Sequence, residues 1–247
     1  MSRILVALLF IFSFFSCLAS KASPIISGIS TNEINIDTNF QGAKILLFGA
    51  KGDSGNIVIA VRGPKKNFLI TKKERFLGVW HNGERAKIKD SYSYYSLFST
   101  FSDTSASADL LNFLELGKSN LKFNFSKEIA ANKQGEFQSQ LIEKLEKDKL
   151  YSVAAKIDFL DETLFKVILN FPKNIARGIY TVEIYLINED NLMSFQSIPI
   201  YINQVGLSAR ILDFAYQESF LYGLITVLLA LVVGWLANYL FARFIGK

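Results

Sequence analysis

The stretch Phe220–Phe241 constrains this chain more than any other, because it carries no charged side chain from end to end. A helix needs about 20 apolar residues to cross a bilayer. Within lipid the backbone must satisfy its own hydrogen bonds, so a single span has to be an unbroken helix. We therefore predict one transmembrane helix over residues 220–241, and a domain before it that is held at a membrane surface.

The flanks and one face of this helix suggest its setting. Arg243 and Lys247 follow the span with no acid between them, which places residues 242–247 in the cytoplasm as a short tail. Small residues repeat at a spacing of four and allow close approach by another helix. The predicted helix-packing face consists of Thr226, Ala230, Gly234 and Asn238. The alternative is that small residues are simply common in membrane helices and that the span is a plain tether.

The first 22 residues are typical of a secretory signal peptide. Arg3 gives a basic start, residues 4–15 form a short apolar core, and Ser20–Ala22 is a small-x-small cleavage site. An uncleaved N-terminal anchor is the alternative. Cys17 is the only cysteine, and Phe15 two positions before it disfavours lipid attachment. A mature chain without cysteine excludes disulfides, thiolate catalysis and cysteine-bound metals.

Charge excludes one class of partner. The formal net charge is +5, but removal of Arg3, Lys21, Arg243 and Lys247 leaves 23 basic residues against 22 acidic ones. A nearly neutral outer domain does not favour nucleic acid as a partner. A hydrophobic content of 50% indicates a folded domain rather than a disordered segment.

Residues 23–206 contain many short runs rich in β-forming residues and bounded by turns. Such spacing predicts a mainly β fold, which we expect to be an immunoglobulin-like antiparallel β-sandwich. Its most specific local signal is Tyr180 at the start of a strand, where a tyrosine hydroxyl often bonds back to the preceding corner. The predicted strands are Glu33–Thr38, Lys44–Ala50, Asn56–Arg62, Asn67–Lys72, Arg75–His81, Tyr94–Thr100, Leu164–Phe171, Tyr180–Ile187 and Phe195–Ile202.

A helical insertion is predicted over about residues 103–150. Asp109–Leu116 and Gly135–Lys149 have apolar residues at helical spacing, and we expect these helices to cap an edge or end of the sandwich. Two separate β-domains on either side of the insertion are the alternative. Residues 207–219 form an amphipathic juxtamembrane helix, set either along the outer leaflet or against the underside of the sandwich.

One cluster of residue types suggests a binding face. Basic side chains gather within one hairpin and aromatic ones follow shortly after, which could attract an anionic ligand, a partner loop or anionic headgroups. The alternative is a solvated hairpin edge that lysine protects from aggregation. The candidate ligand- or partner-binding residues are Arg62, Lys72, Lys73, Arg75, Trp80, Tyr94 and Tyr95.

The sequence offers little catalytic chemistry. His81 is the only histidine and lies beside Asn82-Gly83, a typical turn pair. We identify no catalytic residue, metal site or cofactor, and Gly49–Gly52 lacks the spacing of a phosphate-binding loop. A non-enzymatic accessory or interaction module is therefore the favoured prediction. The alternative is an envelope hydrolase or carbohydrate-active domain that uses acidic residues.

Several ordered blocks resemble a family of alphaproteobacterial transmembrane proteins of uncharacterised function. The blocks are Glu33–Ile36, Phe40–Ala50, Val61–Pro64, Gly78–Asn82, Tyr94–Ser96, Leu164–Phe165, Gly178–Leu186 and Gly234–Trp235. The resemblance covers nearly the whole mature chain and implies a bacterial inner-membrane protein with a periplasmic domain. A membrane-protein partner such as a permease is the expectation that goes with it. It transfers no catalytic residue. His81 stands where the family pattern leads us to expect an apolar residue.

Overall fold

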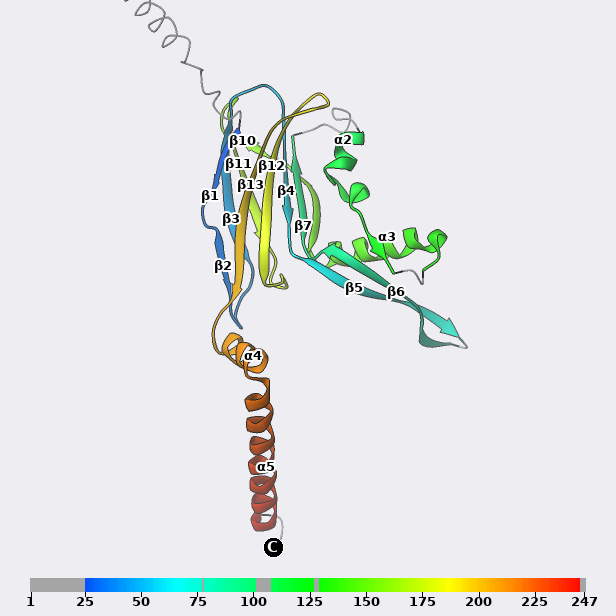
Figure 1. Ribbon diagram of the computed structural model, residues 1–247, viewed down its shortest axis with the longest axis vertical. Coiled ribbons are helices and arrows are strands. Elements are labelled where there is room, and N and C mark those ends of the chain that lie inside the picture. Colours follow the sequence, from blue (N-terminus) through cyan, green and yellow to red (C-terminus); the bar gives the residue numbers. More distant parts are fainter. Residues whose placement is uncertain (1–24, 77, 101–107, 127–128, 245–247) are drawn as a thin grey trace, which may run out of the picture.

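The computed structural model describes residues 25–76, 78–100, 108–126 and 129–244. A body built mainly of β-strands stands on two consecutive helices at the C-terminal end of the chain (Figure 1). The proposed signal peptide lies outside the described residues.

Two sheets form the centre of the body. Sheet A has the strand order β1-β3-β11-β10, and sheet B has the order β2-β13-β12-β4-β7-β9. Neighbouring strands are antiparallel except for β2 with β13 and β7 with β9. The strands of sheet A are Ile25–Ile29, Ala43–Lys51, Leu164–Phe171 and Asp158–Phe159 in that order. Those of sheet B are Glu33–Ile36, Asn191–Gln204, Gly178–Asn188, Asn56–Arg62, Tyr95–Ser99 and Tyr151–Ala155.

The two sheets face each other across a hydrophobic core. In β12, Tyr180, Val182, Ile184 and Leu186 alternate toward this core, because side chains on a strand point to opposite faces in turn. From sheet A, strands β3 and β11 pack against these residues with Ile45, Leu47, Phe165, Val167, Leu169 and Phe171. The mainly β class predicted from the sequence is confirmed.

Both sheets use strands from both sides of the predicted insertion. Strand β3 pairs with β11 from Ala43 to Ala50, and β4 pairs with β12 from Asn56 to Arg62. Segments more than 100 residues apart in sequence are therefore hydrogen-bonded neighbours in the same sheet. Separate β-domains would instead keep each sheet within one part of the chain.

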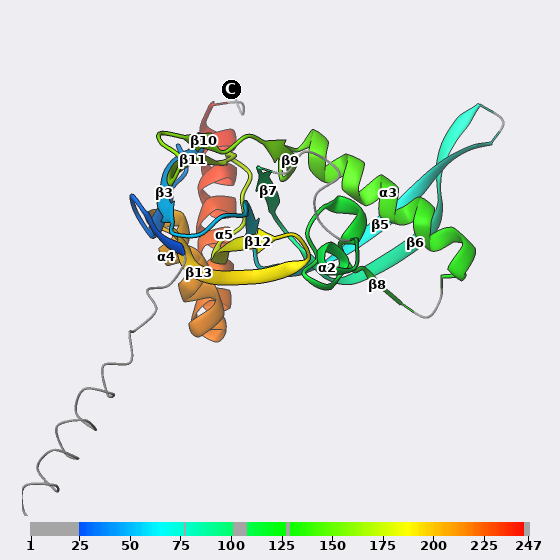
Figure 2. The same ribbon diagram turned by 90° about the horizontal axis from the view of Figure 1, so that it is seen from above.

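Two long connections between strands of sheet B form a third layer on its outer face. The hairpin of β5 (Lys65–Phe76) and β6 (Val79–Tyr92) lies between β4 and β7 in sequence. Helix α2 (Ala108–Phe113), the 3-10 turn η1 (Lys118–Asn120), strand β8 (Asn124–Phe125) and helix α3 (Ala131–Lys147) follow β7. Leu141 and Leu145 of α3 pack with Val58, Ala60 and other residues of sheet B in a second core. The two helices were predicted at an edge or end of the sandwich. Helix α3 contacts the edge strand β9, and its Leu141 and Leu145 also pack on the outer face of sheet B (Figure 2).

The hairpin also differs from its predicted form. Two short strands were expected, with turns near Glu74 and at Asn82-Gly83. In the structure the strands are longer, and the turn is next to Gly78, whose φ of +86° favours glycine. Asn82 pairs with Lys73 inside the ladder, beside a register shift. A β-bulge therefore occupies the position that the Asn-Gly pair had suggested for a turn.

The C-terminal helices form the stalk. Helix α4 (Leu207–Gln217) contacts the start of α5 (Ser219–Phe244) through Phe214 and Tyr222, whose ring centroids are 6.2 Å apart. Arg177 of the sandwich reaches Asp213 of α4 at 3.9 Å. Ser219–Arg243 is long and apolar enough to span a membrane, and its apolar window is wholly uncovered by the rest of the structure.

The corner before β12 is closed by the predicted tyrosine bond. The hydroxyl of Tyr180 donates a hydrogen bond to the carbonyl oxygen of Ala176 at 2.9 Å. Its ring packs against Tyr94 and Phe171 in the core between the sheets, with centroids 5.7 and 5.8 Å away. The bond joins the β11–β12 connection to the centre of sheet B.

Tyr180→Phe should lower the free energy of unfolding by about 1–2 kcal/mol, because the Ala176 carbonyl loses a partner while the ring still fills the core. Urea unfolding of the full chain in detergent, followed by circular dichroism, measures this loss. Tyr201→Phe is the matched control, because Tyr201 is 39% exposed on the same sheet. Equal losses in the two variants would contradict the importance of the corner bond.

Candidate functional site

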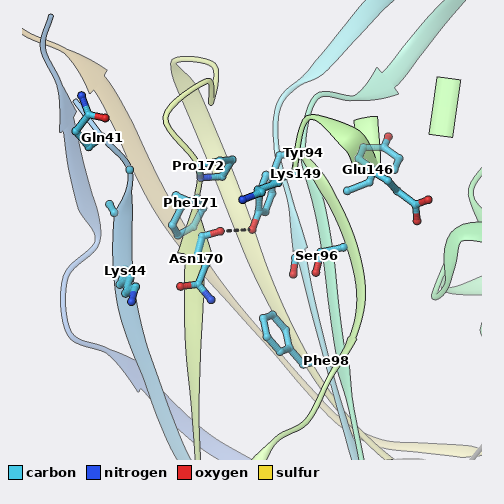
Figure 3. A pocket seen from close by; sticks show the side chains of 14 residues that line it. Gln41, Lys44, Tyr94, Ser96, Phe98, Glu146, Lys149, Asn170, Phe171 and Pro172 are labelled. Carbon is cyan, nitrogen blue, oxygen red and sulfur yellow. Dashed lines mark hydrogen bonds between the residues drawn. The ribbon is translucent and has the colours of Figure 1, made fainter. Parts of the chain in front are cut away.

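A cleft of about 740 Å³ opens between the edges of the two sheets, near the C-terminal end of α3 (Figure 3). Strand β11 forms one wall with Asn170 and Phe171, and the other is formed by Ser96 and Phe98 of β7 with Tyr94 just before that strand. Lys44, Glu146 and Lys149 lie around its rim. The cleft is thus aromatic and hydroxyl-rich inside and charged at its mouth.

Tyr94 is fixed in the cleft wall by its own contacts. Its hydroxyl donates to the carbonyl oxygen of Asn170 at 2.8 Å, and its ring stacks on Phe171 with centroids 5.4 Å apart (Figure 3). Burial raises the pKa of Tyr94 to about 12, so its phenol remains protonated at neutral pH. The residue joins the two sheets and is not poised to act as a base.

The cleft also lacks paired carboxylates. Glu146 is the acidic residue among those that line it, and it forms an ion pair with Lys118. A glycosidase-type mechanism needs two carboxyl groups across a bound sugar. Among the residues that the structure describes, no group of three or more His, Cys, Asp or Glu side chains could hold a metal ion.

A second candidate surface is the outer face of sheet A. The outward positions of its strands carry Ile26, Leu46, Phe48, Leu164 and Ile168, all at least 40% exposed. We call these five residues the apolar face. Leu46 stands opposite Ile168 in the β3–β11 ladder. The Phe48 ring lies over Gly28, where an added Cβ would be 3.2 Å from the ring.

A shallow hollow of about 430 Å³ adjoins the apolar face. Its lining includes Ile26, Phe48 and Leu164, together with Leu160, which is 65% exposed. An antiparallel sheet with one solvated face normally alternates apolar inward and polar outward residues. Sheet A departs from that rule on three strands, although Lys166 opposite Phe48 separates Leu164 from Ile168 on β11. Clustered exposed apolar residues of this kind mark interaction sites.

The structure separates the binding residues that the sequence grouped together. Arg62 is 8% exposed and Tyr95 is fully buried, so both lie beneath the third layer. The Tyr95 hydroxyl donates to the Glu115 carbonyl oxygen at 3.2 Å and accepts from the Gly117 amide at 2.8 Å. Lys72 pairs with Glu136 of α3 at 2.9 Å.

Three of the grouped residues remain together near the end of the β5–β6 hairpin. The Arg75 guanidinium lies over the Trp80 ring, 6.0 Å from its centroid, and Arg75 and Trp80 are opposite each other in the ladder. Lys73 is exposed two residues before Arg75. The burial of Arg62 and Tyr95 depends on the layer that follows β7 in sequence, whereas Tyr94 is buried in the core between the two sheets.

Arg62 has a structural role at the end of β4. It forms an ion pair with Glu183 of β12 and donates to the Leu114 carbonyl oxygen at 2.6 Å. It also donates to the Tyr185 hydroxyl at 3.3 Å, and its guanidinium lies 5.6 Å from the centroid of the Tyr92 ring. These contacts tie sheet B to the segment that follows α2.

The predicted packing face of α5 is exposed along the span. Thr226, Ala230, Gly234 and Asn238 are all exposed, and nothing in the described structure lies within 4 Å of a Cβ built at Gly234. The Thr226 hydroxyl donates to the carbonyl oxygens of Tyr222 and Gly223, each at 2.9 Å. That hydroxyl is satisfied within its own helix, while the small side chains leave room for close approach.

A β body joined to one apolar helix therefore defines the class of this protein, and comparison with known proteins identifies the family. The model of the family described as "Putative transmembrane protein (Alph_Pro_TM)" matches residues 24–243. The chain belongs to this family, which confirms the resemblance seen in the sequence. No curated protein matches the chain.

One solved structure shows a distant likeness. It is described as "Structural basis of T cell specificity and activation by the bacterial superantigen toxic shock syndrome toxin-1". The matched chain is 6% identical, and the match covers 73% of this chain and 99% of that one, with a TM-score of 0.26. A TM-score of that size supports no inference about fold or function.

Arg62→Met should lower the free energy of unfolding by about 3 kcal/mol, because it leaves the largely buried Glu183 without its partner. Chemical unfolding of the full chain measures this loss. Lys73→Met removes an exposed basic residue from the neighbouring hairpin and should change stability by less than about 0.5 kcal/mol. An Arg62 variant as stable as the Lys73 control would contradict a structural role for the Arg62–Glu183 pair.

Gly234→Leu should weaken association of α5 with another helix without impairing insertion, because leucine is apolar but too large for close backbone approach. Val233→Leu, about 100° around the helix, is the matched control. Crosslinking yield from membranes measures association. Equal yields for wild type and both variants would reduce α5 to a plain tether.

Proposed function

We propose that this protein is a non-enzymatic interaction module that binds another membrane protein through the apolar face of sheet A. The family match and the candidate span associate the chain with a membrane. The observation that carries the proposal is the exposure of Ile26, Leu46, Phe48, Leu164 and Ile168 on one sheet face. A permease in the same membrane is the class of partner that we favour.

The contrast between the two sheets supports this choice of surface. The outer face of sheet B is covered by α3 and its neighbours, which form a second core there. Sheet A has apolar outward residues but lacks such a layer within the described chain (Figure 2). A partner that covered this face would supply the missing layer and remove several large apolar side chains from water.

The geometry of the stalk supports a partner in the same bilayer. The strands of sheet A run up and away from α4, so the apolar face looks sideways rather than toward α5 (Figure 1). A neighbouring membrane protein whose domain extends a similar distance from the bilayer would contact the apolar face from the side. Tethering both proteins to one bilayer raises their effective concentration, so a modest apolar surface suffices.

We also propose that the body is an immunoglobulin-like sandwich. The orders β1-β3-β11-β10 and β13-β12-β4-β7 correspond to strands A-B-E-D and G-F-C-C′ of a variable-type domain. The Tyr180 bond to Ala176 corresponds to the tyrosine corner of such domains. These domains commonly serve as binding modules, although fold alone does not specify function.

The proposal also covers which membrane holds the protein and on which side the β body lies. The apolar core of residues 4–15 and the cleavage motif at Ser20–Ala22 support export of the body. Arg243 and Lys247 after the span support a cytoplasmic C-terminus. We therefore place the β body in the periplasm and α5 in the bacterial inner membrane.

The experiment places a photo-crosslinking amino acid at Phe48 in the full chain in living cells. The expected result is one discrete adduct with an integral membrane protein, absent when the probe replaces exposed Lys147 on α3. Leu46→Lys with Ile168→Lys should reduce the adduct at least about tenfold, because charges cannot be buried in an apolar interface without a partner. Both side chains are exposed, so the fold should persist, which circular dichroism checks.

Other outcomes count against the proposal. An adduct of twice the chain mass would identify the apolar face as a self-association surface. Equal labelling at Phe48 and Lys147, or an adduct that survives the double lysine variant, would remove the apolar face as the binding site.

A further inference from the structure

The outer part of the β5–β6 hairpin extends beyond the rest of the β body. Near its base, Phe68, Ile70 and Ile88 pack in the second core. Two ion pairs with α3 follow, Lys72 to Glu136 at 2.9 Å and Lys133 to Glu84 at 2.7 Å. Past these pairs the hairpin projects beyond α3 in both views (Figures 1 and 2). We call Lys73, Arg75, Val79 and Trp80 in this outer part the arm.

The arm combines exposed apolar side chains with positive charge. Trp80 and Val79 are 65% and 69% exposed, and Lys73 and Arg75 are exposed as well. In the ladder Arg75 is opposite Trp80, and Lys73 is opposite Asn82, so Lys73, Arg75 and Trp80 share one face. Glu74 is opposite His81 and belongs to the alternate pairs.

Arg75 and Trp80 are held together before any ligand arrives. The guanidinium lies over the indole at 6.0 Å from its centroid, and the Arg75 Nε donates to the Gly78 carbonyl oxygen at 3.3 Å. Packing inside the protein does not explain why a tryptophan occupies position 80, because most of its indole ring faces solvent. Tryptophan beside arginine and lysine is the composition found at headgroup level in membrane proteins.

The position of the arm gives it access to a bilayer. In Figure 1 the hairpin slopes downward and out to one side of the stalk, and its end lies level with α4, which leads directly into α5. In Figure 2 its end points to the same side as the C-terminal end of α5. A bilayer crossed by α5 would have its outer surface close to the junction of the two helices. The arm therefore lies on the membrane side of the β body, to one side of the span.

We propose that the arm binds anionic phospholipid headgroups of the bilayer that α5 crosses. Lys73 and Arg75 would attract the phosphates, while Trp80, on the same face, enters the headgroup region. Contact at a second point would stop the β body from rotating freely about α5 and would hold the apolar face in one direction. The inference requires α5 to span a bilayer, but it does not require a partner on sheet A.

The test uses the full chain reconstituted into vesicles, with Trp80 as the only tryptophan. The chain has two tryptophans, so Trp235→Phe leaves Trp80 as the reporter. We expect its emission to shift to the blue and acrylamide quenching to fall in phosphatidylcholine vesicles that contain phosphatidylglycerol. Shallow spin-labelled lipids should quench it. Lys73→Glu with Arg75→Glu should weaken the contact equilibrium at least about fivefold.

A matched control separates lipid contact from reconstitution itself. Asn191→Trp in a chain that lacks both native tryptophans places the reporter at the β12–β13 turn, away from the stalk (Figure 1). This reporter should remain open to acrylamide and unquenched by lipid labels in every vesicle. Trp80 emission matching this control would overturn the proposal. Protection that is equal in vesicles without phosphatidylglycerol, or unchanged by the two glutamates, would overturn the anionic headgroup as the ligand.

Discussion

The burial of sheet B on both of its faces is the constraint on which the rest of this structure depends. Strand β4 shows it most clearly, because every residue from Ile57 to Arg62 is buried. Ile57, Ile59 and Val61 point into the core between the sheets, whereas Val58 and Ala60 point into the second core. A central sheet of this kind couples the sandwich to the third layer, so neither can form its full core without the other.

The terminal guanidinium nitrogens of Arg62 are held beneath the third layer by contacts with elements distant in sequence, whereas its Nε has no partner in the described structure. Arg62 pairs with Glu183 from 121 residues away and bonds the carbonyl of Leu114. Buried ion pairs are weak evidence for stability, but a buried charge without its partner costs several kcal/mol. The cluster therefore acts as a positional constraint that keeps the segment after α2 against sheet B.

The layering explains why the two proposed surfaces, the apolar face of sheet A and the arm of the β5–β6 hairpin, have different roles. The third layer occupies the outer face of sheet B and directs the β5–β6 hairpin outward, whereas the apolar face of sheet A stays open. A span, a membrane-contacting arm and an exposed sheet face then lie on different sides of one body. Such an arrangement would present a binding surface at a fixed height and in a fixed direction beside a bilayer.

The sequence by itself determined the features that rest on local chemistry. An uncharged apolar run predicts the span, alternation predicts most strands, and the tyrosine at the start of β12 predicts the bond to Ala176. Each depends on residues within one segment, where periodicity and turn chemistry act directly. The family resemblance also followed from the sequence and is confirmed.

Only the tertiary structure decided which faces are covered. Arg62, Tyr94 and Tyr95 belong to a basic and aromatic stretch and suggested a surface, yet they are buried by segments from elsewhere in the chain. The unbroken apolar run Ile57–Val61 was the available signal for burial on both faces. The apolar face shows the converse, because Leu46, Phe48 and Ile168 occupy outward positions that only the paired register of β3 and β11 brings together. Burial is a property of the packed layers, and a strand's own sequence does not contain the layer that will lie upon it.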